Sequence, residues 1–214
     1  MVKQTLITQA QIINMEQRYR NHFVNSLSGF KSANLVGTQD NSGQTNLSIV
    51  SSVFHLGANP ALMGLIIRPH SVPRHTFENI KQLGFYTLNQ VSHEFYQQAH
   101  QTSARYEKEV TEFSATGLEP EYIADFVAPF VKQSKLKIGL KLVEHQTLAC
   151  NGTELIVGEI QCVLIEPNAI DEDGFVCLQQ LNTVAVNGLD GYSAPQKSTR
   201  MSYAKPDKAP SILK

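Results

Sequence analysis

Apolar positions recur with a helical period near the start of the chain. Between residues 11 and 27 they are spaced three or four apart, which places them on one face of a helix. Gly29 follows where a helix commonly ends. We therefore predict one amphipathic helix over about residues 11–27, with an apolar stripe made of Ile12, Met15, Tyr19, Phe23 and Leu27.

The rest of the chain is dominated by short apolar runs and two-residue alternation, the pattern of β-strands. Asn151-Gly152 is the strongest hairpin signal between two such runs. Residues 76–83 and 92–106 have helical character, whereas 113–130 is rich in loop-forming residues and is expected either to form a flap or to cover an edge. Strands are predicted over residues 33–38, 45–54, 62–67, 85–91, 135–148 and 153–166.

Repeated hairpins with few long helices favour a mainly β fold, an antiparallel β-barrel with attached helices, because closing a sheet removes its exposed edges. The length of 214 residues suits a single domain over residues 1–214. Residues 204–214 hold two prolines and few core-forming side chains, so we expect an irregular C-terminal tail.

The charge of the chain is nearly balanced, with a formal net charge of −1 and no basic stripe. Nucleic acid and anionic membranes are therefore not expected partners. No apolar run is long enough to span a bilayer and the first residues lack a secretory signal pattern, so we expect a cytoplasmic protein. The seven histidines follow no metal-binding spacing, and we predict no metal site.

A phosphate site is indicated where cationic side chains precede a predicted helix. Arg68 and Arg74 supply fork-shaped donors, and His75 adds a further donor. Thr76 stands where an N-cap would present its hydroxyl beside the free amides of the first helical turn. Together these residue types fit a phosphate dianion, although arginine near a helix start is also common on solvated surfaces.

The strand upstream of this segment carries small polar side chains that suit a flat ligand with polar edges. A phosphorylated heterocycle such as FMN would satisfy both the strand and the phosphate segment. The strand residues that we expect to contact it, through side chains or amides, are Asn46, Leu47, Ser48, Ser51, Ser52 and Val53.

The order of these segments resembles the flavin reductase-like family of FMN-binding split barrels over about residues 28–203. The resemblance is distributed along the chain and not confined to one short motif. It is carried by residues 29–32, 34–38, 46–54 before Asn59-Pro60, 68–80 and 155–160.

The resemblance implies a six-stranded Greek-key split barrel that forms a homodimer, with FMN near the subunit interface. The strand 46–53 would line the isoalloxazine ring, while Arg68, Arg74, His75 and Thr76 would hold the phosphate. Lys31 is a further candidate, because a cation near the reduced ring would raise its potential.

Two departures from the family bear on the reaction. Many of its reductases carry Lys-Asp-Thr at the phosphate helix, where this chain has Arg74, His75 and Thr76. Nicotinamide-using members often carry Gly-Asp-His before the late strand, where this chain has Asn151-Gly152-Thr153. The contact to NADH or NADPH implied by the family is therefore absent or moved.

Three functions remain open from the sequence. The first is an oxidoreductase that passes electrons from NADH or NADPH through FMN to an acceptor, for which no catalytic side chain is assigned. The second is an FMN-binding electron carrier or flavin store without nicotinamide turnover. The third is a dimeric module that binds another phosphorylated ligand in the same place.

Overall fold

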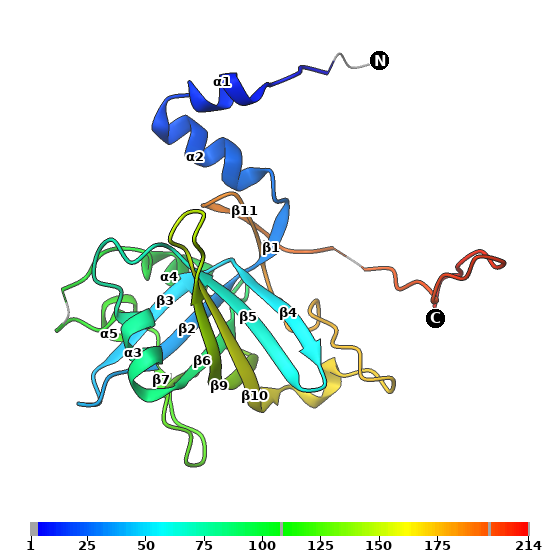
Figure 1. Cartoon of the computed structure of the whole chain (residues 1–214). Coiled ribbons are helices and arrows are strands. Elements are labelled where there is room, and N and C mark those ends of the chain that lie inside the picture. The colour runs from blue at the N-terminus through cyan, green and yellow to red at the C-terminus, as the bar shows by residue number, and fades with distance from the viewer. Residues whose placement is uncertain (1–3, 108, 197, 214) are drawn as a thin grey trace.

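An antiparallel β-barrel forms the centre of the computed structural model, which describes residues 4–107, 109–196 and 198–213 (Figure 1). Seven strands form one sheet in the order β3-β2-β6-β9-β10-β5-β4, and every neighbouring pair is antiparallel. In chain order they are β2 (Asn34–Gln39), β3 (Thr45–Val50), β4 (Val53–Ala58), β5 (Ala61–Ile67), β6 (Phe85–Gln90), β9 (Leu136–Thr147) and β10 (Glu154–Ile165).

The sheet closes because its two outermost strands are consecutive in sequence. Only Ser51 and Ser52 separate β3 from β4. The sequence predicted one strand over 45–54; in the structure this segment bends, and its two halves form the first and the last strand of the sheet. The Ser52 hydroxyl donates to the Ile66 carbonyl oxygen at 2.6 Å and holds the bend against β5. Counted as one bent strand, β3 and β4 make the barrel six-stranded.

The connections are of Greek-key type. The hairpin β9–β10, predicted across Asn151-Gly152, lies between β5 and β6, which are consecutive strands in the chain. The chain therefore crosses one end of the barrel through α3 (His75–Leu83) to reach β6. The predicted antiparallel split barrel is confirmed, and α3 is placed beside β2 and β3.

Two apolar clusters share strand β2, which is buried on both faces. Val36 points into the barrel and packs in a cluster with Tyr86, Leu140 and Ile156. Its neighbour Leu35 faces outward, because successive strand residues alternate, into a second cluster. That cluster lies beneath α4 (Tyr96–Gln101) and α5 (Glu112–Thr116) and includes Leu47, Val91, Phe95, Ala99, Phe113, Val131 and Val184.

The excursion over residues 113–130 covers the outer face of the barrel. It holds most of α5 and the short strand β7 (Pro120–Glu121), and it ends where β8 (Phe130–Val131) begins. The carbonyl oxygen of Pro129 lies over Gly37 of β2, and a Cβ added at Gly37 would be 2.2 Å from that oxygen. The same oxygen accepts a hydrogen bond from the Thr87 hydroxyl of β6 at 2.7 Å. The segment is thus packed onto β2 and β6.

The N-terminal region forms two helices where the sequence predicted one. They are α1 (Gln9–Ile13) and α2 (Gln17–Ser26), and the prediction of a continuous helix over 11–27 is corrected. The break arises because Glu16 acts as a new N-cap and accepts the amide of Tyr19 at 2.9 Å. Neither helix contains a buried residue, and both project from the barrel (Figure 1).

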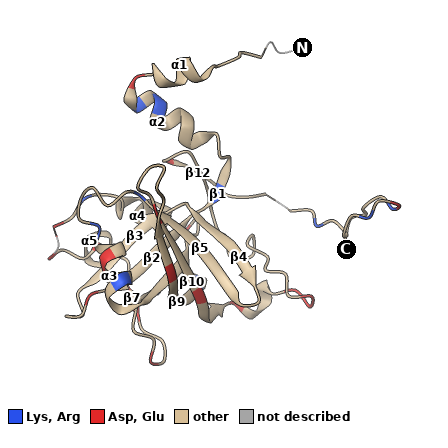
Figure 2. Ribbon diagram, in the orientation of Figure 1, with Lys and Arg blue, Asp and Glu red and all other residues tan. Residues whose placement is uncertain are grey.

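A small second sheet lies at the base of these helices, and an extended tail follows it. The sheet pairs β1 (Phe30–Ser32), β11 (Ala185–Asn187) and β12 (Gly191–Ser193), while η1 (Pro167–Ala169) follows β10. The ribbon coloured by residue type shows the positions of Lys, Arg, Asp and Glu scattered over the elements without a band of one sign (Figure 2). No helix among the described residues is long and apolar enough to cross a membrane.

Candidate functional site

The helix α3 begins with amides that no side chain caps. Pro73 precedes Arg74, which is the N-cap residue; its side chain makes no capping bond, and its own amide donates to Glu78 Oε1 at 3.2 Å. The sequence placed Thr76 at the N-cap, whereas the structure places it second in the helix. Gly84 ends α3 with a φ of 73°, in the left-handed region that favours glycine. The first turn of α3 therefore offers open backbone donors and the positive end of the helix dipole.

Thr76 joins this helix start to strand β3. Its hydroxyl oxygen accepts the Asn46 side-chain amide at 2.8 Å and lies 2.9 Å from the Ser48 hydroxyl. Asn46 and Ser48 share one face of β3 because strand residues alternate. The structure thus brings together three of the residues that the sequence assigned to the site.

Leu47 lies between them and points to the opposite face. Its side chain is fully buried in the cluster under α4 and α5, and its amide donates to Glu112 Oε2 at 2.8 Å. The amide of Leu47 is therefore already engaged within the chain. Burial raises the pKa of the Glu112 carboxyl, and the hydrogen bond from Leu47 opposes that shift.

The bend between β3 and β4 holds the remaining strand candidates. Ser52 uses its hydroxyl to fix the bend to β5, and Val53 packs against the barrel core. Ser51 is half-buried at the same bend. The contacts of these three residues to a flavin ring remain predictions. The contact of Lys31 is a prediction too; its ammonium group donates to the carbonyl oxygens of Asn25 at 3.3 Å and Gly188 at 3.2 Å.

Three arginines gather beside the start of α3. Burial lowers the pKa of Arg74, and the nearby positive charges of Arg68 and Arg105 lower it further. The Arg74 Nε atom donates to the Pro69 carbonyl oxygen at 3.0 Å, which fixes the guanidinium over the loop before the helix. Among the described residues, no carboxylate forms an ion pair with any of the three. This concentration of like charge favours an anionic ligand.

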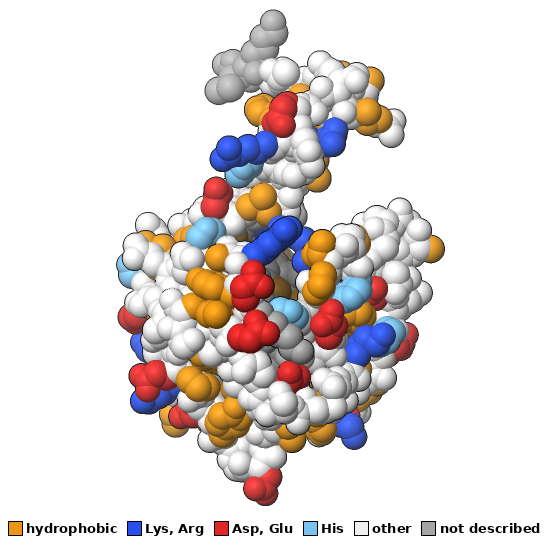
Figure 3. All heavy atoms as spheres, turned by 90° about the vertical axis from the view of Figure 1, so that its left-hand side faces the viewer, with side chains coloured by type: hydrophobic (Ala, Val, Ile, Leu, Met, Phe, Trp, Pro, Cys, Tyr) orange, Lys and Arg blue, Asp and Glu red, His pale blue; other side chains and the backbone are white. Residues whose placement is uncertain are grey.

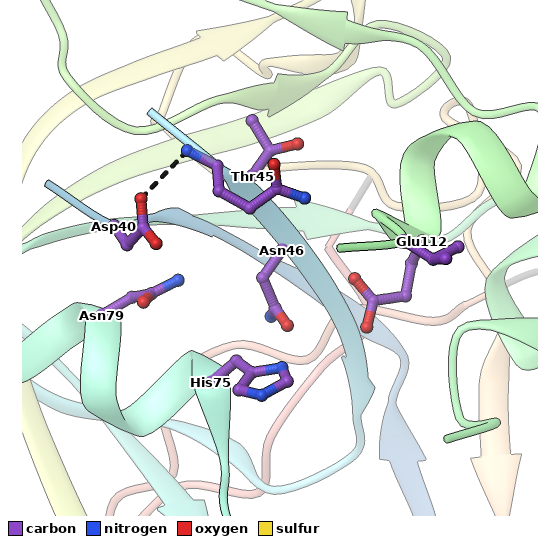
Figure 4. A pocket seen from close by; sticks show the side chains of 8 residues that line it. Asp40, Thr45, Asn46, His75, Asn79 and Glu112 are labelled. Carbon is purple, nitrogen blue, oxygen red and sulfur yellow. Dashed lines mark hydrogen bonds between the residues drawn. The ribbon is translucent and has the colours of Figure 1, made fainter. Parts of the chain in front are cut away.

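His75 faces a small polar cavity on the other side of the helix start. The cavity has a volume of about 10 Å³, close to the space of one water molecule. Figure 4 shows His75 and Asn79 from α3, Asn46 from β3 and Glu112 from α5 around it, with the Glu112 carboxylate turned toward the histidine ring. The cavity is far too small for a flavin ring system.

The tip of the β9–β10 hairpin also reaches the loop between β5 and α3. Gly152 has a φ of 72°, and a Cβ added there would lie 3.7 Å from the Pro69 Cβ. Asn151-Gly152-Thr153, the departure noted in the sequence, therefore lies beside the loop that carries Arg68 and Arg74.

Sequence reasoning missed two residues of this region. Arg105 lies in irregular chain after α4, where the sequence predicted the end of a helix over 92–106. Glu112 lies at the start of α5, next to the segment read as a loop-rich excursion. Glu112 reaches the site through the packing of α5 onto β3, and Arg105 lies close enough to Arg74 to lower its pKa; the sequence carries no local signal for either contact.

Comparisons with known proteins show the family and the fold of the chain. A family model for the flavin reductase like domain matches residues 28–180. A split-barrel protein of Shewanella frigidimarina NCIMB 400, provisionally named a flavin reductase, is 61% identical, with a TM-score of 0.91 over 94% of this chain and 100% of that chain.

Two more distant proteins are also similar. Flavoredoxin of Desulfovibrio vulgaris (Miyazaki F) is 21% identical, with a TM-score of 0.69 over 85% of this chain and 93% of that chain, and shares the fold. A protein of Aquifex aeolicus without an assigned activity is 24% identical over 140 residues, which is 64% of this chain and 70% of that protein.

Proposed function

The chain belongs to the flavin reductase-like domain family, and from this premise we propose that it is an FMN-dependent oxidoreductase that transfers electrons from NADH or NADPH to an acceptor. One observation carries the proposal. Three arginines without a carboxylate partner among the described residues lie beside the uncapped start of α3, next to the polar face of β3. We further propose that the working form is a cytoplasmic homodimer.

The donor set fits the phosphate of FMN. Arg68 and Arg74 supply always-charged bidentate donors, and Arg105 adds a third positive charge. Thr76 and His75 lie in the first turn of α3, where backbone amides favour an anion. Arg74 is preorganised by its bond to Pro69, so that little side-chain entropy is lost on binding.

The strand β3 and its bend fit the edge of an isoalloxazine ring. Asn46 and Ser48 are oriented by Thr76, which couples ring contacts to phosphate contacts. Two-electron transfer between a nicotinamide and an acceptor is the chemistry that FMN supplies when bound. The residues of this chain contribute binding, orientation and electrostatic tuning, so that a general acid or base is not required.

A second candidate is an FMN-binding electron carrier without nicotinamide turnover. It is favoured by Asn151-Gly152-Thr153, which stands where nicotinamide-using members often have Gly-Asp-His, and by the position of that turn beside Pro69. Both candidates require FMN and differ only in the electron donor.

The phosphate assignment is tested by calorimetric titration of the full chain with FMN and with riboflavin, which lacks the phosphate. Combining Arg68→Ala with Arg74→Ala is expected to weaken FMN binding by at least about tenfold, because charge-assisted hydrogen bonds are lost, while riboflavin binding changes little. Arg18→Ala removes an exposed arginine of α2 and serves as the control. Equal losses for both ligands would refute the assignment.

A further inference from the structure

The imidazole of His75 stands at the start of α3, where a positive charge is ordinarily unfavourable. His75 is the first residue of the helix, and the helix dipole places positive partial charge at this end. Burial lowers the pKa of Arg74 beside it, and the charges of Arg68 and Arg105 lower that pKa further. A protonated imidazole in this place is therefore stabilised only by a negative group nearby.

Glu112 supplies a negative group from the facing helix α5. Its carboxylate is turned toward the His75 ring across the cavity of about 10 Å³ (Figure 4). The Leu47 amide donates to its Oε2 atom at 2.8 Å, and the hydroxyl oxygens of Thr111 and Thr45 lie 2.8 Å apart. Both contacts fix the start of α5 to β3, so the carboxylate is held in place beside the helix start.

The charges of His75 and Glu112 act on each other. Burial raises the pKa of the Glu112 carboxyl, and the positive charge of His75 opposes that rise together with the amides of Leu47 and of Glu112 itself. Two groups that interact in this way titrate as a pair, with one shared proton between the two steps. Loss of that proton adds one negative charge beside the start of α3.

The other carboxylates near the ring have contacts of their own. Asp40, in the turn before β3, lines the same cavity, and its Oδ1 atom accepts two amides of its own turn at 2.9 and 3.0 Å. Glu78, on α3, accepts the Arg74 amide at 3.2 Å. The remaining cavity-lining residues are uncharged, namely Gln44, Thr45, Asn46, Asn79 and Val110.

The face of the molecule that carries α3 and α5 has basic, acidic and histidine side chains gathered around a hollow below the N-terminal helices (Figure 3). We propose that Glu112 is a positioning residue for phosphate recognition, because it retains a proton on its pair with His75 and so keeps a positive imidazole at the start of α3. A rise in pH removes this proton and weakens phosphate binding. The inference rests on the proposed function, in which FMN supplies the phosphate.

Urea denaturation of the FMN-free chain tests the pair by itself. The effects of His75→Asn and Glu112→Gln on the unfolding equilibrium constant are expected to depart from additivity by at least about threefold at pH 6. At pH 9, where histidine is ordinarily neutral, they should add. Glu144→Gln, at an exposed position on β9, serves as the control and should add to His75→Asn at both pH values. Additive effects of His75→Asn and Glu112→Gln at pH 6 would overturn the proposal.

Calorimetric titration of the full chain with FMN and with riboflavin tests the role of the pair in binding. Between pH 7 and pH 9 the phosphate of FMN is already a dianion, since its second pKa is about 6. We expect the ratio of FMN affinity to riboflavin affinity to fall at least about threefold over this range in the unmodified chain. Glu112→Gln should lose this fall, because no carboxylate then retains the proton, and His75→Lys should lose it because lysine stays charged. Glu144→Gln should keep it.

Each outcome of the titration decides the proposal. An affinity ratio that is constant from pH 7 to pH 9 in the unmodified chain overturns it, and so does a fall that keeps its full size in Glu112→Gln. In both cases FMN uptake leaves the proposed function standing. A chain that binds neither flavin refutes the proposed function, and the inference falls with it.

Discussion

Single residues link the two halves of the candidate site. The hydroxyl of Thr76 is the common partner of Asn46 and Ser48, so the start of α3 and the polar face of β3 are held at a fixed distance. Arg74 is fixed separately by the Pro69 carbonyl. A ligand that contacts the strand and the helix start at once therefore meets donors that are already oriented.

Glu112 gives a prediction about the pH dependence of stability. Burial raises the pKa of its carboxyl in the folded chain above the ordinary 4.5, so the folded state binds the proton more tightly than the unfolded state. The contribution of Glu112 to the free energy of unfolding therefore falls as the pH rises from about 4.5 through the raised folded pKa, and is constant above it. Glu112→Gln keeps an oxygen acceptor for the Leu47 amide and removes this loss.

Urea denaturation of both proteins between pH 4 and pH 8 checks the prediction. The variant should gain stability relative to the unmodified chain as the pH rises through this window. Glu144→Gln, at an exposed position on β9, should show no such trend. If the difference in the free energy of unfolding between Glu112→Gln and the unmodified chain does not depend on pH, the raised pKa of Glu112 is contradicted.

At the scale of elements, a glycine in strand β10, Gly158, leaves the space that the Tyr86 side chain fills inside the barrel. Its register shifts between Val157 and Gly158, and a Cβ added at Gly158 would lie 2.2 Å from the Tyr86 hydroxyl oxygen. Tyr86 is fully buried, its hydroxyl has no hydrogen-bond partner in the described part of the chain, and burial raises its pKa. The glycine is required because the barrel interior is filled at this point.

This packing predicts a pair of opposite stability changes. Gly158→Ala should lower the free energy of unfolding by about 1–3 kcal/mol through overpacking. Tyr86→Phe should raise it by roughly 1 kcal/mol, because a buried hydroxyl without a partner is removed. The double variant should recover part of the loss, since the nearest contact is gone. Strictly additive changes in urea denaturation would show that the two side chains do not meet.

The pattern of nearby residues in the sequence predicted those elements that form from residues close together in the chain. Alternation gave the strands, and Asn151-Gly152 gave the β9–β10 hairpin close to its observed bounds. The bend at Ser51 and Ser52 was not visible, because it is made by pairing with β5 and not by a turn signal. The same limit applies to Arg105, which reaches the site through tertiary packing.

The break between α1 and α2 had a local cause that the apolar period concealed. The spacing from Ile12 to Leu27 continues through it, whereas Glu16 restarts the helix by capping. No residue type in the sequence marked this break, because glutamate is not among the residues preferred at an N-cap.

At the scale of the whole molecule, the barrel is the compact part and the two termini extend from it. The barrel closes through a single bent strand, and the excursion over residues 113–130, which follows Glu112 directly, covers the outer face of β2 and β6. The two N-terminal helices and the C-terminal tail carry exposed apolar side chains, among them Tyr19, Leu27 and Tyr203. The loop that carries Arg68 and Arg74 meets the tip of the β9–β10 hairpin at one end of the barrel, so the candidate site belongs to the body of the fold.

The central proposal is tested most directly by anaerobic stopped-flow absorbance of the FMN-loaded protein mixed with NADH or NADPH. We predict rapid loss of the oxidised-flavin band with one of the two nucleotides, because bound FMN accepts electrons from a nicotinamide. A band that persists with both nucleotides would contradict a nicotinamide-dependent oxidoreductase and leave the FMN-binding electron carrier.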